Sequence, residues 1–140
     1  MLGQNDQMGE AMSATQAATL YVGLNIAILI GLIVQVILQR RKHKCVIGDG
    51  GHPTLLLAIR AHANAVEVMP LALVGLVALA SVGASAVSVH ALGVALTLGR
   101  VLHAYGLSNS SGTSFGRMVG MLLSLLALAG TGIMCLLAAL

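Results

Sequence analysis

A small set of polar residues in an otherwise apolar sequence could bind an anion or move a proton: Arg60, Asn64, Glu67, Arg100, His103 and Arg117. On a helix, the first three fall at about 0°, 40° and −20°, so they share one narrow face. Arg100 and His103 lie about 60° apart on a second helix. Three arginines against one glutamate favour an anionic ligand, because guanidinium groups bind carboxylates through paired hydrogen bonds.

The same residues could instead serve only to hold helices together. In that alternative, Arg60 or Arg100 would neutralise Glu67 across a helix bundle. The alternative accounts for one arginine but not for all of them, because structural pairing needs acidic partners and this part of the chain has only one.

The composition indicates a membrane protein. Of 140 residues, 58% are hydrophobic and 8% are charged, whereas a soluble domain is about one-quarter charged. This excludes a soluble globular protein, a disordered chain and a disulfide-stapled secreted domain. Four of the seven basic residues fall within residues 40–44, beside an apolar segment. Such a cluster is typical of a membrane flank, and no aromatic residues are interleaved for base stacking, so we expect no nucleic-acid partner.

The uncharged segments predict an all-α membrane protein, a bundle of four transmembrane helices. A spanning helix needs about 20 mostly apolar residues, and the segments place helices at about 17–39, 53–80, 86–107 and 114–137. The small polar run at 81–85 suits a tight turn, and Pro53 suits a helix start. These helices form a single domain, preceded by a flexible tail at 1–13. No His, Cys or carboxylate set has the spacing of a metal site.

The charge distribution predicts an orientation in the membrane. Basic residues favour the cytoplasmic side, so residues 40–44 are expected in the cytoplasm and both termini outside. The polar residues named above then all fall in the cytoplasmic half of the bundle. Ionisable groups within a membrane face the bundle interior or an aqueous cavity and mark function.

Several segments resemble the MAPEG family, the membrane-associated proteins in eicosanoid and glutathione metabolism. The sequence RAHANAVE at 60–67, followed by Met69-Pro70, is similar to the second-helix signature, and GRVLHAYG at 99–106 to the third-helix signature. The segments GDGG at 48–51 and GRM at 116–118 resemble the compact bacterial branch. The resemblance covers nearly the whole chain from about Ala17 and implies a bacterial inner-membrane protein.

The resemblance implies a homotrimer that binds glutathione between adjacent subunits, near the cytoplasmic face. Such proteins conjugate the thiol to lipophilic electrophiles, reduce lipid hydroperoxides or isomerise endoperoxides, and some bind lipids without catalysis. By motif position, Arg117 is the catalytic arginine that stabilises the glutathione thiolate. The implied glutathione-binding residues are Arg60, Asn64, Glu67, Arg100 and His103, with Tyr105 and Arg40 as the nearest counterparts of two further positions. Close helix contact at Gly116 and Gly120 is consistent with oligomer packing.

Three positions differ from the eicosanoid-metabolising members. Ala63 stands where those members have a glutathione-contacting arginine, Leu107 where a tyrosine is expected, and Leu38 near an expected arginine. The differences favour, as an alternative, a non-catalytic lipid- or amphiphile-binding membrane protein of the same fold. A small transporter or channel is a third hypothesis, but it would need polar residues in both halves of the bundle.

Overall fold

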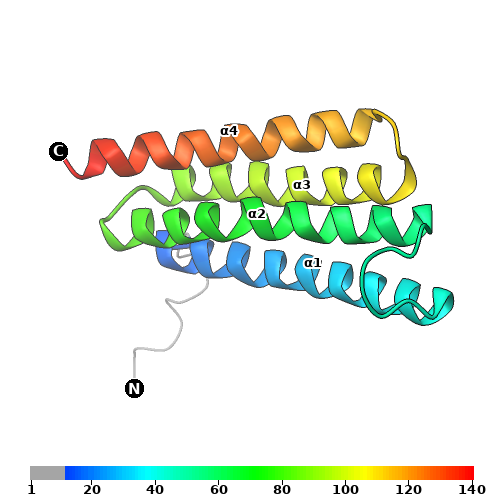
Figure 1. The fold of residues 1–140 in the computed structure, drawn as a ribbon. Helices are drawn as coiled ribbons and strands as arrows, with labels where there is room; N and C mark the ends of the chain where they lie inside the picture. The colour runs from blue at the N-terminus through cyan, green and yellow to red at the C-terminus, as the bar shows by residue number, and fades with distance from the viewer. Residues whose placement is uncertain (1–11) are drawn as a thin grey trace, which may run out of the picture.

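The computed structural model describes residues 12–140, which form four helices. These are α1 (Ala14–His43), α2 (Pro53–Ser81), α3 (Ala86–Asn109) and α4 (Phe115–Ala138). They run side by side along one axis, and consecutive helices point in opposite directions (Figure 1). All four are long and apolar enough to cross a membrane. The predicted fold class is confirmed, whereas the predicted tail at 1–13 lies, apart from its last two residues, outside the described residues.

Helix α1 extends beyond its predicted bounds at both ends. At its start, Ser13 and Gln16 form a capping box in which each side chain accepts a hydrogen bond from the other's backbone N–H, which satisfies two otherwise free donors. At its end, the basic residues 40–43 remain helical until Lys44 adopts the left-handed conformation. Cations stabilise the negative end of a helix. A prediction from apolar residues alone cannot detect these polar turns.

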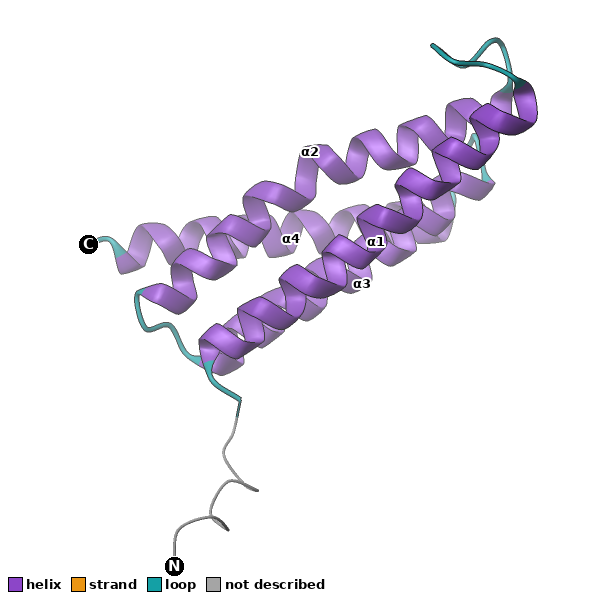
Figure 2. Cartoon of the chain, turned by 90° about the horizontal axis from the view of Figure 1, so that it is seen from below, coloured by secondary structure: helices purple, strands orange, loops and turns teal. Residues whose placement is uncertain are grey.

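The four helices are not equivalent in the bundle. Within residues 12–140, α2 and α3 each pack against all three other helices, whereas α1 and α4 do not contact one another. Figure 2 shows the same bundle from below, with α1 and α3 adjacent. The central pair, α2 and α3, carries most of the polar residues that the sequence singles out, and two of them, Arg100 and His103, are buried.

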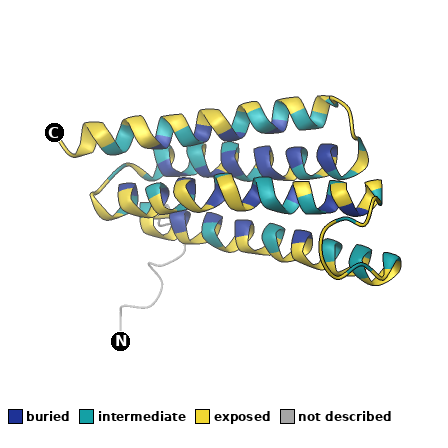
Figure 3. Ribbon diagram, in the orientation of Figure 1, coloured by how far each residue is buried: buried dark blue, intermediate teal, exposed yellow. Residues whose placement is uncertain are grey.

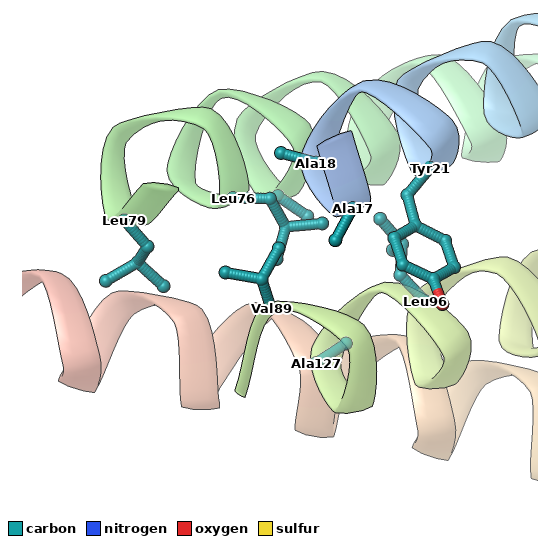
Figure 4. Close-up of a cluster of buried hydrophobic side chains, with 9 residues drawn as sticks. Ala17, Ala18, Tyr21, Leu76, Leu79, Val89, Leu96 and Ala127 are labelled. Atoms are coloured by element: carbon teal, nitrogen blue, oxygen red, sulfur yellow. The ribbon is translucent and has the colours of Figure 1, made fainter. Parts of the chain in front are cut away.

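Buried residues recur at intervals along each helix, between stretches of exposed and intermediate residues (Figure 3). One core cluster includes Tyr21, Leu76, Val89, Leu96 and Ala127, which meet from all four helices near the end that holds the C-terminus (Figure 4). Many large apolar side chains on the outside remain exposed. This arrangement suits a bilayer, because lipid tails are as apolar as the side chains that face them.

Helices α3 and α4 approach closely because glycines line their contact. A Cβ atom on Gly120 would meet the backbone nitrogen of His103 and come within 2.6 Å of the Gly99 carbonyl oxygen. A Cβ on Gly116 would lie 3.1 Å from the carbonyl oxygen of Leu102. The expectation that Gly116 and Gly120 serve oligomer packing is therefore corrected: both glycines face α3 of the same chain.

Candidate functional site

A groove of about 850 Å³ lies between α2 and α4, at the end of the bundle that carries the α3–α4 loop. Its volume lies within the range of about 300–1,000 Å³ that is common for small-molecule sites. The groove has a polar part, formed by Arg60, Asn64, His103 and Arg117, and an apolar wall, formed by Leu56, Met118, Leu122 and Leu125. Residues 111–114 of the α3–α4 loop also line the groove.

Arg100 lies behind the groove and is only 2% exposed. Its Nη1 donates a hydrogen bond to Asn64 Oδ1 at 2.9 Å, and its Nε donates to Ser124 Oγ at 3.0 Å. The hydroxyl of Ser124 in turn donates to the carbonyl oxygen of Gly120 at 2.7 Å. An amide from α2 and a hydroxyl from α4 therefore hold this guanidinium, so the partner of Arg100 is not Glu67, as one form of the interhelical alternative proposed.

The Nη2 atom of Arg100 is buried and has no hydrogen-bond partner among residues 12–140. A buried donor without an acceptor costs free energy, about 1–3 kcal/mol for a neutral group and more for a charged one. Its neighbour Asn64 lines the groove. The unpaired donor therefore lies behind Asn64, from where the positive charge of Arg100 favours an anionic group in the groove without contacting it.

Two further polar residues reach the groove from α3 and from the first turn of α4. His103 is almost fully buried. It faces Gly120 of α4, and because glycine has no side chain, the backbones of α3 and α4 can approach closely here. Arg117 lies three residues after Ser114, the N-cap of α4. The backbone nitrogen of Arg117 donates a hydrogen bond to Ser114 Oγ at 3.3 Å. The guanidinium of Arg117 donates to the Gly112 carbonyl oxygen at 3.3 Å. Arg117 thus places its charge at the positive end of α4.

The structure does not bring every predicted residue to the groove. Arg60 and Asn64 line it, but Glu67 does not line it and is exposed on the surface of α2. Tyr105 is 71% exposed and also lies outside the groove. Arg40 does not line the groove either. Its Nη1 donates hydrogen bonds to carbonyl oxygens of the α1–α2 loop.

Sequence reasoning missed Ser124 and the apolar wall. Ser124 is a polar residue within the apolar run of α4, seven positions after Arg117. On a helix this spacing returns to within about 20° of the same face. That periodicity was a usable signal that Ser124 faces the same polar layer.

The comparisons with known proteins identify the family of the chain. The model of the MAPEG family matches residues 18–137, which include most of α1 and α4 and the whole of α2 and α3. The chain belongs to the MAPEG family. The resemblance inferred from the polar motifs is thereby confirmed, and so is the identification of the chain as an integral membrane protein with four transmembrane helices.

This MAPEG protein is also similar to an inner membrane protein, YecN, from Escherichia coli strain K12. The two are 37% identical over 89 residues, which cover 64% of this chain and 68% of YecN. YecN from Escherichia coli O6:H1 strain CFT073 matches with the same identity and coverage. No solved structure matches the chain.

Proposed function

We propose that this MAPEG protein is a glutathione-dependent membrane transferase or peroxidase that acts on lipophilic electrophiles or hydroperoxides. The observation that carries the proposal is the groove between α2 and α4, in which cationic residues face an apolar wall. An enzyme that joins a charged thiol to an apolar partner needs both surfaces in one site.

The residues present fit glutathione. Its carboxylates match guanidinium groups, which bind them through paired hydrogen bonds. Arg60 lines the groove. Behind the groove, the Nη2 atom of Arg100 has no acceptor among the described residues. We propose that Arg60 binds a carboxylate directly, assisted by Asn64, and that Arg100 attracts it through its charge from behind Asn64. His103 would contribute a polar contact at the floor.

Glutathione would supply the thiol, and the chain would supply the field that ionises it. A free thiol has a pKa of about 8.5, and a nearby guanidinium lowers that pKa. Arg117 adds its own charge to the positive end of α4. We therefore assign to Arg117 the stabilisation of the thiolate at neutral pH, and no protein side chain needs to form a covalent bond.

The second substrate would enter from the bilayer. Met118, Leu122 and Leu125 line the groove and are exposed on the surface of α4. Because this surface contacts lipid tails in a spanning helix, an apolar molecule dissolved in the membrane reaches the groove without crossing water.

A purified preparation in detergent tests the proposal directly. We expect conjugation of a dinitrohalobenzene, or reduction of a lipid hydroperoxide, that requires glutathione. Arg60→Ala should weaken glutathione binding about tenfold or more, since a hydrogen bond to a charged group contributes about 1.5–3 kcal/mol. Arg60 is exposed, so its removal leaves no buried group unpaired. The matched control is Arg41→Ala, an exposed cation at the end of α1, which should leave binding unchanged.

A second candidate function is a non-catalytic binder of lipids or amphiphiles. Two observations favour it: Glu67 and Tyr105 lie outside the groove, and much of the groove wall is apolar. In the experiment above, glutathione binding without turnover, or displacement of a fluorescent fatty acid without any effect of glutathione, would favour this function over the first.

We also propose that the protein is a homotrimer. Glu67 lies near the middle of α2 and is exposed on the single chain. A carboxylate in the middle of a membrane needs a polar partner, and a neighbouring copy can provide one. Cross-linking in native membranes should then yield a trimer that Glu67→Gln weakens. A monomer that Glu67→Gln leaves unchanged would contradict the assembly.

We propose a bacterial inner-membrane location with both termini outside and residues 40–44 in the cytoplasm. The basic cluster at the end of α1 supports this orientation, since positive loops stay on the cytoplasmic side. The similarity to an inner membrane protein supports the compartment. A membrane-impermeant maleimide should therefore fail to label Cys45 in intact cells and label it once the membrane is opened.

A further inference from the structure

The α1–α2 loop exposes two apolar side chains beside a group of cations. Val46 and Ile47 are 85% and 88% exposed, the most exposed positions of any valine or isoleucine among residues 12–140. Just before them, Arg41, Lys42 and Lys44 are all exposed. Exposing two apolar side chains to water is unfavourable. A partner that offers an apolar interior beneath a negatively charged surface would match both the apolar pair and the cations.

The loop is held in place and does not trail away from the bundle. Nη1 of Arg40 donates hydrogen bonds to the carbonyl oxygens of Cys45, Val46 and Gly48 at 3.3, 2.9 and 3.0 Å. The backbone nitrogen of Cys45 also donates to the Arg40 carbonyl oxygen at 3.1 Å. These bonds turn the chain back beside the last turn of α1 and leave the side chains of Val46 and Ile47 free.

The two ends of the loop are also joined. The imidazole rings of His43 and His52 stack with their centroids 4.1 Å apart. His43 Nε2 lies 2.9 Å from Thr54 Oγ1 in the first turn of α2. The loop therefore has a fixed position relative to both helices, and the exposure of its apolar pair follows from that fixed geometry.

The length of α1 places this loop at the membrane surface. From Ala14 to Gln39 the helix is about 39 Å long, compared with a hydrocarbon core of about 30 Å and a whole bilayer of about 40–45 Å. Arg40 thus lies at headgroup depth if the helix spans the membrane. Because residues 45–48 fold back to Arg40, the side chains of Val46 and Ile47 remain at that depth as well.

We propose that the α1–α2 loop binds anionic phospholipid headgroups, with Val46 and Ile47 inserted among the upper parts of the lipid chains and Arg41, Lys42 and Lys44 contacting the phosphates. Charge complementarity selects this occupant, since clusters of lysine and arginine beside a membrane helix attract anionic lipids. Arg40 is a positioning residue here, because its guanidinium is engaged by the loop itself. The proposal does not depend on the function of the groove.

Fluorescence quenching in reconstituted vesicles tests the proposal. A single cysteine is introduced by Ile47→Cys in a Cys45→Ser, Cys135→Ser background, and it is labelled with bimane. The protein is placed in vesicles of phosphatidylcholine alone or of an equimolar mixture with phosphatidylglycerol, each with brominated chains. We expect quenching at least about twofold stronger in the mixture, and the difference should disappear in high salt.

The matched control is a bimane at position 82, introduced by Val82→Cys. Val82 is an exposed apolar residue in the α2–α3 turn at the opposite end of the bundle, where no basic residue is adjacent. Its quenching should not depend on phosphatidylglycerol. Replacing Arg41, Lys42 and Lys44 together by glutamine should remove the dependence at position 47.

Equal quenching at position 47 in the two kinds of vesicle would overturn the proposal. So would an effect of phosphatidylglycerol that survives the three glutamine substitutions or is equally large at position 82. If the triple variant does not reconstitute, the salt dependence of the otherwise unchanged loop decides the question. An acidic protein partner would leave position 47 insensitive to lipid charge and would therefore count against the proposal.

Discussion

Arg117→Ala is expected to lower turnover with glutathione about a hundredfold while changing glutathione affinity only a few-fold, as is common when one charge-stabilising donor is lost. The guanidinium of Arg117 lies at the groove and at the positive end of α4, where it would stabilise a thiolate more than a neutral thiol. Removing the guanidinium should therefore lower the fraction of bound glutathione that is thiolate, while the contacts to the glutathione carboxylates stay in place.

The pH dependence gives this prediction a definite sign. A nearby positive charge lowers the pKa of a thiol, so removing Arg117 should raise that pKa. The rate of the variant should then recover as the pH rises, and the ultraviolet absorbance of the bound thiolate should appear at higher pH than in the unmodified protein. Arg117→Lys, which keeps a charge at the site, should restore part of the effect.

Parallel measurements of binding and turnover separate this role from a structural one. Isothermal calorimetry gives the affinity, and single-turnover kinetics give the chemical step. Equal losses of affinity and rate in Arg117→Ala, or a pH profile that does not move, would show that Arg117 only binds the ligand or only supports the α3–α4 loop through Gly112.

Gly120→Ala is expected to destabilise the protein by about 1–3 kcal/mol, the usual cost of overpacking a tight contact. The new methyl group would meet the backbone nitrogen of His103 and lie 2.6 Å from the Gly99 carbonyl oxygen. These are backbone atoms, which cannot rotate away as a side chain can. The helices must therefore separate, and His103 and the hydrogen bonds around Ser124 would move with them.

Gly132→Ala on the same helix is the matched control. In the described part of the chain, a Cβ at Gly132 meets no atom within 4 Å. This substitution should therefore be neutral or stabilising by up to about 1 kcal/mol through the higher helix propensity of alanine. Thermal unfolding in detergent, followed by circular dichroism, measures both variants. Similar melting temperatures for the two would contradict the close packing of α3 on α4.

The sequence correctly predicted which polar residues share a face when they lie on the same helix. The spacing of Arg60 and Asn64 correctly placed both on one face, and the same face lines the groove. Helical periodicity cannot give the rotation of a neighbouring helix, however. It also cannot show how far a groove extends along a helix. Glu67 lies within about 20° of Arg60 around α2 but about 10 Å further along the axis, beyond the last α2 residue that lines the groove, Asn64.

Two other predicted binding residues, Tyr105 and Arg40, lie outside the groove for local reasons. Tyr105 follows His103 by two positions, which turns it about 160° away around α3 and leaves it exposed. Arg40 was assigned by its charge near the end of the first helix. The loop that follows supplies carbonyl oxygens that engage it, and a loop conformation with glycines at positive φ is not readable from periodicity.

The buried Arg100 also bears on how the chain enters the membrane during synthesis. An arginine near the middle of an inserting segment costs about 2.5–3.5 kcal/mol on translocon-derived scales, and α3 is the least apolar of the four segments. Its partner Asn64 is synthesised before α3, and Ser124 comes after it. We therefore expect α3 to stay beside α2 during insertion until α4 emerges and supplies Ser124, so that α2, α3 and α4 acquire their final places together.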